Sequence, residues 1–188
     1  MLTHHDSWEF VFGLKERCNA LLKEMHIAHG FFHAPLDDAE FGTSASLTEA
    51  LGAVQGKQVM PYADVFFGGR IGELKCPGEF EAFARRASVI LDEPVRRFKN
   101  HDKPVKRICV AAGGGNLTTD MKCAAEEGCD TYVTGEYALY SQMYARLAGM
   151  NLLVGSHTST EYPGIRALGE HLVEGTGLEL VRIPESND

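Results

Sequence analysis

The feature that most constrains the fold is a regular alternation of apolar and amphipathic segments between residues 106 and 183. Apolar runs predict strands at 106–112, 130–134, 150–155 and 178–183. Between them, apolar residues at helical spacing predict helices at 118–127, 137–148 and 163–174. Because strands and helices that alternate in this way form βαβ units, we expect an α/β fold whose sheet is largely parallel or mixed and flanked by helices.

The first half of the chain carries weaker patterns. Helices are predicted at 7–25, at 43–54 and from Pro77 to about Leu91, and a buried strand at 27–32. Further strands are predicted at 64–74 and 94–98, and the polar loop KNHDKP joins the latter to 106–112 as a hairpin or a short connection. We expect a single domain over residues 1–188. Possible lobes are 1–55 plus 105–188, with 56–104 as a peripheral insertion because the alternation weakens there.

Charge and cysteine content limit the classes of partner. The 188 residues have a formal net charge of −8, which argues against nucleic acid or an anionic membrane as the main partner and favours a small-molecule or cation-binding role. The five cysteines form no CxxC pair and are interpreted as reduced core residues of a cytoplasmic protein. No signal peptide and no apolar run of ~20 residues is recognisable.

Residues of metal-ligand type follow three predicted strands. In open α/β sheets, the loops after the strands converge on one crevice, so these side chains are expected to meet. Imidazole and carboxylate groups together suit zinc, iron, manganese or nickel, and one carboxylate can bridge two cations. The candidates, in chain order, are His4, His5, His33, Asp37, His157 and Glu161.

Each candidate also has an ordinary interpretation when it is taken alone. A histidine pair near a chain start can simply lie on the surface. Asp37 can begin a turn. Thr160 or Glu161 can cap the helix predicted from Pro163, where a carboxylate is favoured by the helix dipole.

The order of the motifs resembles a known family. The paired histidines, HAPLDDAEFG, GGGN, DTYVTGE and GSHTSTEYPGIRAL follow one another as in the Nif-three-like dinuclear metal-binding family, also described as GTP cyclohydrolase I type II-like. The resemblance implies that Glu161 bridges two divalent cations, that His5 and Asp37 complete one position, and that His4 and His157 complete the other. It also implies a homohexamer and a purine nucleotide as substrate, with His33 beside the site.

The chain departs from the family pattern in several places. Asp6 follows the histidine pair where relatives usually have proline, GSH replaces the more usual GH, and Tyr140 stands where a histidine is common. Relatives normally carry further strand and helix units before the pair. We therefore expect a shortened or alternatively started chain, in which the strand that holds His4 and His5 is poorly paired and poorly buried.

Two further motifs leave alternatives open. The GGGN stretch, residues 113–116, is either a tight strand-to-helix turn or an anion site at a helix start. Glu136, in TGEY, is a general base, a carboxylate that orients a ligand, or a helix cap. Tyr132, Tyr137, Tyr140 and Tyr144 are interpreted as packing and rim residues.

These observations favour a metal-dependent hydrolase-like enzyme that acts on a nucleotide or another small phosphorylated substrate. Two cations can lower the pKa of a shared water and stabilise developing negative charge. The alternative is a non-enzymatic metal-binding or regulatory protein. A third hypothesis, loss of the site through the short N-terminus, predicts substoichiometric metal.

Overall fold

The computed structural model describes residues 1–6, 11–62 and 65–183. Its helices are α1 (Leu14–Glu24), α2 (Ala34–Asp38), α3 (Thr43–Ala50), α4 (Phe80–Leu91), α5 (Thr118–Glu126), α6 (Leu139–Ala148) and α7 (His157–Val173). Its strands are β1 (Leu2–Thr3), β2 (Gly30–Phe31), β3 (Ala53–Tyr62), β4 (Phe66–Gly78), β5 (Arg96–Phe98), β6 (Val105–Ala111), β7 (Thr131–Thr134) and β8 (Asn151–Val154).

Six strands form one mixed sheet in the order β3-β4-β6-β7-β8-β5. The pairs β6–β7 and β7–β8 are parallel, whereas β3–β4, β4–β6 and β5–β8 are antiparallel. The parallel part is thus the βαβαβ unit that the alternation from residue 106 predicts. The α/β class is confirmed, and the sheet is mixed rather than largely parallel.

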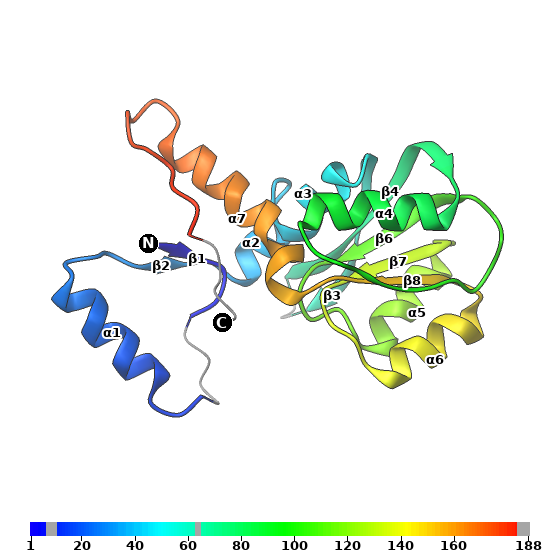
Figure 1. Cartoon of the computed structure of the whole chain (residues 1–188), viewed down its shortest axis with the longest axis horizontal. Helices are drawn as coiled ribbons and strands as arrows, with labels where there is room; N and C mark the ends of the chain where they lie inside the picture. The colour runs from blue at the N-terminus through cyan, green and yellow to red at the C-terminus, as the bar shows by residue number, and fades with distance from the viewer. Residues whose placement is uncertain (7–10, 63–64, 184–188) are drawn as a thin grey trace.

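The central strands are buried on both faces. Ile108 and Val110 of β6 join one apolar cluster with residues of α3 and α4, whereas Cys109 joins a second cluster with residues of α5 and α6. Alternation of side chains along a strand explains this division. Figure 1 shows α4 over one face of the sheet, and α5 and α6 against the other.

The N-terminal segment with β1, α1 and β2 lies to one side of the six-stranded sheet (Figure 1). Strands β1 and β2 pair in parallel with Leu2 opposite Gly30, and α1 lies beside them at the left of Figure 1. None of the residues of α1 is buried. The apolar stripe that predicts a helix at 7–25 therefore forms a shorter helix with no core contact, and Ser7 and Trp8 lie outside the described residues.

Several boundaries predicted in the first half are wrong. The strand expected at 27–32 is reduced to β2, and α3 ends at Ala50 because the chain turns into the unpredicted strand β3. Pro77 lies in β4, so the next helix begins only at Phe80. Helix α3 begins at Thr43, as predicted, and its N-cap is Gly42.

Three predictions in the second half are also wrong. Strand β5 pairs with β8 and not with β6, so the hairpin alternative is wrong and the two strands are joined by a short connection. Residues 178–183, all described, form no strand. Helix α7 begins at His157, six residues before Pro163.

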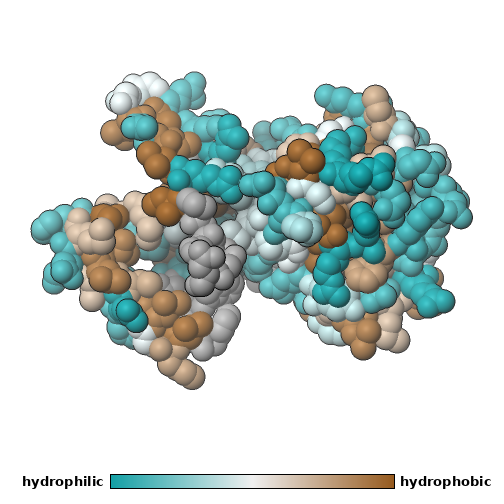
Figure 2. Space-filling view, in the orientation of Figure 1, coloured by the Kyte–Doolittle hydropathy of each residue, from teal (hydrophilic) through white to brown (hydrophobic). Residues whose placement is uncertain are grey.

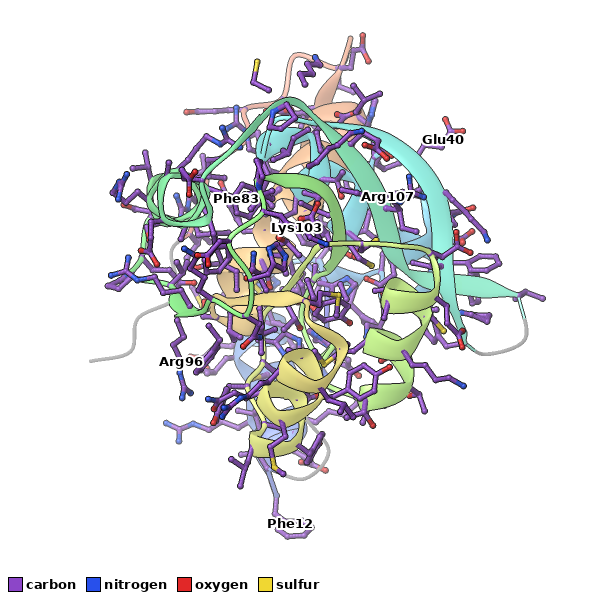
Figure 3. All side chains as sticks on the ribbon, turned by 90° about the vertical axis from the view of Figure 1, so that its right-hand side faces the viewer. Phe12, Glu40, Phe83, Arg96, Lys103 and Arg107 are labelled. Atoms are coloured by element: carbon purple, nitrogen blue, oxygen red, sulfur yellow. The ribbon has the colours of Figure 1, made fainter. Side chains whose placement is uncertain are left out.

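The segment 56–104, predicted to be a peripheral insertion, contributes β4 to the middle of the sheet. It also supplies α4, whose buried Phe83 points toward the strands in Figure 3. The division of the chain into lobes stays a prediction.

The cysteines are all free, but only Cys109 and Cys129 are buried, and Cys76 is exposed. The prediction of a core position is therefore wrong for Cys76. No helix in the described ranges has both the length and the hydropathy that a membrane span requires.

Candidate metal centre

The start of α7 places two candidate ligands on one helix face. Ser156 caps the helix, since its side chain accepts a hydrogen bond from the Ser159 N–H at 3.1 Å. The N–H of Ser156 in turn donates to Glu93 Oε1 at 2.6 Å. His157 and Glu161 then stand four residues apart, which brings their side chains together on one face. The predicted cap roles of Thr160 and Glu161 are therefore wrong.

The paired histidines follow β1. The chain start is held by Met1, whose amino group donates to Ala28 O at 2.6 Å. His4 is only 5% exposed. The ladder is short, as expected, but the expectation of poor burial is wrong for His4.

Asp37 comes from α2, a helix of five residues that follows β2. Its two carboxylate oxygens each accept a hydrogen bond at 2.6 Å, Oδ1 from the hydroxyl of Thr43 and Oδ2 from the hydroxyl of Tyr62. Thr43 begins α3 and Tyr62 ends β3, so two elements of the main body fix this carboxylate.

These three segments meet around Glu161. Its Oε1 lies 2.9 Å from His157 Nε2 and 3.6 Å from His4 Nε2, and its Oε2 lies 3.3 Å from His5 Nε2. Asp37 Oδ1 lies 3.2 Å from His4 Nε2. All five predicted ligands are thus brought into one cluster, although they come from opposite ends of the chain.

The tautomers of two histidines determine what the cluster can hold. His4 Nδ1 lies 2.8 Å from Phe32 O, and because a carbonyl only accepts, Nδ1 carries the proton. In the neutral ring, His4 Nε2 then presents a lone pair to the oxygens of Asp37 and Glu161. This nitrogen is buried without a hydrogen-bond partner among the described residues. Hydrogen-bond acceptors that face one another need a positive charge between them. This set of imidazole nitrogens and carboxylate oxygens therefore fits metal cations.

The same reasoning applies to His157. Its Nδ1 lies 2.8 Å from Glu136 Oε1, which leaves Nε2 to face Glu161 and, at 3.0 Å, His5 Nε2. A carboxylate that holds the distal imidazole N–H is the usual support of a metal-binding histidine. Glu136 therefore acts on His157 and not as a helix cap.

The electrostatics agree with a centre that attracts positive charge. The hydrogen bond to Glu161 raises the pKa of His157 to about 9. Burial alone would raise the pKa of Glu161, but its contacts with His157 and His5 lower it to about 2. Burial likewise opposes ionisation of Asp37, yet its pKa is lowered by His4, Thr43 and Tyr62. Both carboxylates are thus held as anions despite their burial.

The GGGN turn closes the other side of the cluster. Gly113 has φ +66°, and a Cβ placed on it would lie 2.1 Å from Glu161 Oε1 and 2.9 Å from His157 Nε2. The turn is bound to α7, since the Gly113 N–H donates to the Thr160 hydroxyl at 3.0 Å. The glycine is needed because no side chain fits between the turn and the ligands.

The distances group the ligands differently from the resemblance. His4 lies against Asp37 and His5 lies against His157, whereas the resemblance pairs His5 with Asp37 and His4 with His157. His33 lies beside both N-terminal histidines, with ring centroids 4.9 Å from His4 and 4.7 Å from His5. Among the described residues, two sets of side chains are close enough to share an ion: His4, His5 and His33, and His5, His157 and Glu161.

Three residues of the site escaped the sequence analysis. Tyr62 ends the unpredicted strand β3, and Thr43 is the first residue of α3. Gly113 was noticed only as part of a turn. A triple glycine between a buried strand and a helix was the one available signal of a close approach to the site.

A family model and several named proteins match most of the chain. The family model described as Duf34/NIF3 (NGG1p interacting factor 3) matches residues 6–188, so His4 and His5 precede the matched range. A protein of Haemophilus influenzae named GTP cyclohydrolase 1 type 2 homolog is 33% identical over 171 residues, with 89% of this chain and 66% of the relative covered. A protein of Pseudomonas aeruginosa with the same name is 30% identical over 188 residues, with 95% and 72% covered.

Solved structures show the same fold. Protein ybgI, described as of unknown function, has a TM-score of 0.82 and 28% identity, with 93% of this chain and 68% of that chain covered. Reduced HcgD from Methanocaldococcus jannaschii has a TM-score of 0.75 at 24% identity, with 95% and 71% covered, and supports the fold alone. The chain spans about two thirds of the length of the Haemophilus influenzae relative.

Proposed function

Because this chain belongs to the Duf34/NIF3 family, we propose that it binds two divalent cations through His4, His5, Asp37, His157 and Glu161. The same centre is proposed to act as a metal-dependent hydrolase on a nucleotide or another small phosphorylated substrate. The name GTP cyclohydrolase 1 type 2 homolog, carried by the similar proteins, supports a nucleotide.

The observation that carries the proposal is the convergence of imidazole Nε2 atoms and carboxylate oxygens. The Nε2 atoms of His4 and His157 face Glu161 because both rings have their Nδ1–H committed to oxygens outside the cluster. Without metal, the raised pKa of His157 keeps a proton on its Nε2, and a bound cation would replace that proton. Glu161 is 7% exposed, so water does not solvate this arrangement fully. Imidazole and carboxylate donors without a cysteine suit zinc, iron, manganese or nickel.

Bound cations would supply Lewis acidity toward a water and an electrophilic oxygen. The chain's own residues prepare the site for them. Glu161 has contacts on both carboxylate oxygens, which suits a bridging ligand. Glu136 Oε1 is taken by His157, which supports an orienting role for Glu136 over that of general base.

Metal binding is tested first on the full chain after treatment with a chelator. We expect elemental analysis and calorimetric titration with Zn²⁺, Mn²⁺, Fe²⁺ or Ni²⁺ to give two cations per chain. Glu161→Gln keeps the side-chain size but weakens binding by more than about 100-fold, since even a supporting residue of a metal ligand contributes ~10–100-fold. Glu170→Gln, on the exposed side of the same helix, is the matched control and leaves binding unchanged. A chain that binds no cation, or binds two without Glu161, refutes the metal centre.

Turnover is then measured over a panel of nucleotides and phosphoesters. Hydrolysis that requires added metal and is lost in Glu161→Gln supports the enzyme. Tight metal binding with no turnover that depends on Glu161 supports instead a non-enzymatic metal-binding or regulatory protein.

We also propose a homo-oligomer, with the hexamer that the family resemblance implies. Exposed apolar side chains gather on the part of the molecule that contains α1, at the left of Figure 2. Phe12 is 96% exposed and projects from the chain in Figure 3, and Met25 is 65% exposed. Apolar surface of this kind is typical of protein contacts. Light scattering of the purified chain gives the number of copies, and a monomer at micromolar concentration contradicts this proposal.

A further inference from the structure

Asp37 sits in an arrangement that the proposed metal centre alone does not explain. Its helix, α2, has only five residues, too few to hold a side chain rigidly by itself. Both carboxylate oxygens nevertheless accept a short hydrogen bond, from Thr43 on Oδ1 and from Tyr62 on Oδ2, each at 2.6 Å.

We propose that Tyr62 and Thr43 are positioning residues that fix Asp37 as a one-oxygen ligand of one of the two cations. This inference rests on the proposed metal centre. Tyr62 binds Oδ2, while Oδ1 lies 3.2 Å from His4 Nε2. A carboxylate oxygen has two acceptor positions, so Oδ1 can accept from Thr43 and still face the cluster.

The two donors lie on rigid elements. Thr43 is fully buried, and the backbone of α7 packs closely against it, since a Cβ on Gly164 would lie 2.5 Å from Thr43 N. Tyr62 is paired with Phe66 across the β3–β4 ladder. The position of Asp37 is therefore set by the main sheet and by α7, and α7 also carries Glu161. Asp37 and Glu161 are therefore positioned by the same helix.

This arrangement predicts two cation positions that differ in how their ligands are held in place. His5, His157 and Glu161 already have ligand atoms within 4.8 Å of one another. The position that uses Asp37 depends in addition on two hydroxyl groups. Removing one hydroxyl is therefore expected to lower the affinity for one cation and to leave the affinity for the other nearly unchanged.

The test uses Tyr62→Phe and Thr43→Val, which remove the hydroxyls and keep the side-chain size. Calorimetric titration with Zn²⁺ is expected to show one of two affinities reduced by about 10–100-fold in each variant. With Co²⁺, the visible absorption of that cation shifts, because the position of a ligand oxygen changes. Thr43→Ser keeps the hydroxyl and is expected to restore wild-type affinity. Tyr140→Phe, at a half-exposed tyrosine on α6, is the matched control.

A double-mutant cycle decides whether the hydroxyl acts through Asp37. In an Asp37→Asn background, Tyr62→Phe is expected to cause no further loss of affinity. If wild-type protein binds two cations and both Tyr62→Phe and Thr43→Val bind them with unchanged affinities and spectra, the positioning role is wrong. A loss of thermal stability without a change in cation affinity also overturns it. If wild-type protein binds no cation, the proposed function itself fails, which is a distinct result.

Discussion

Replacing Gly113 by alanine adds one methyl group beside the candidate ligands. The new Cβ would lie 2.1 Å from Glu161 Oε1, far inside van der Waals contact, and 2.9 Å from His157 Nε2. Gly113 also has φ +66°, which L-residues with a side chain rarely adopt. The substitution therefore combines backbone strain with displacement of Glu161.

The two effects can be separated by a matched glycine. Gly149 has φ +63°, and nothing lies within 4 Å of the place that a Cβ would take there, so Gly149→Ala carries the strain alone. A left-handed backbone costs a non-glycine residue roughly 1–2 kcal/mol. Overpacking adds typically about 1–3 kcal/mol, so Gly113→Ala is expected to cost about 2–5 kcal/mol of folding free energy.

Urea unfolding of the metal-free variants measures the change in the free energy of folding. Titration with Zn²⁺ measures the cation affinity of each variant. Gly113→Ala is expected to lose cation affinity by at least about 100-fold, because Glu161 must move. Gly149→Ala is expected to keep wild-type affinity. Equal stabilities for the two variants, together with unchanged cation binding in Gly113→Ala, would refute the close approach of the turn to the ligands.

Three further predictions concern the core, the thiols and the coupling of metal to stability. Phe83→Ala is expected to cost about 3–5 kcal/mol in urea unfolding, whereas Val89→Ala, 81% exposed on the same helix, changes stability by less than about 0.5 kcal/mol; similar losses would contradict a shared core. A thiol reagent is expected to modify exposed Cys76 in the folded protein and buried Cys109 only after unfolding, and mass mapping of the products checks this order. A cation at about 100 times its Kd is expected to stabilise the fold by ~2.7 kcal/mol, seen as a rise in Tm that a chelator reverses; no rise in Tm would contradict selective binding to the folded state.

The sequence predicts the second half of the fold better than the first. Strands β6, β7 and β8 are short apolar runs between helices, and their burial on both faces makes the pattern local and strong. Strand β3 was missed because Gly56, Lys57 and Gln58 interrupt its apolar alternation. Its position is decided by pairing with β4, a contact that no local pattern encodes.

For the site, residue type at strand ends indicated six candidate side chains, and the family resemblance reduced them to five, but neither predicted their arrangement. All five predicted side chains meet, because the loops after β2 and β8 and the segment after β1 converge. Which histidine lies against which carboxylate depends on backbone partners such as Phe32 O. Such a partner has no side-chain signature and cannot be identified from a sequence.

Three side chains of the candidate cluster, His4, His157 and Glu161, are positioned by groups outside it, and these groups belong to different parts of the fold. Phe32 O orients His4, Glu136 orients His157, and Gly113 leaves the space that Glu161 occupies. Bringing buried acceptor atoms together has an unfavourable free energy. This free energy is therefore offset by the folding of the whole domain and not by local structure. Because this orientation exists in the metal-free fold, the proposed binding of a cation would need little rearrangement, and the free energy of coordination would appear as affinity. A substitution in any of these outer contacts should then lower cation affinity more than it lowers the stability of the metal-free fold.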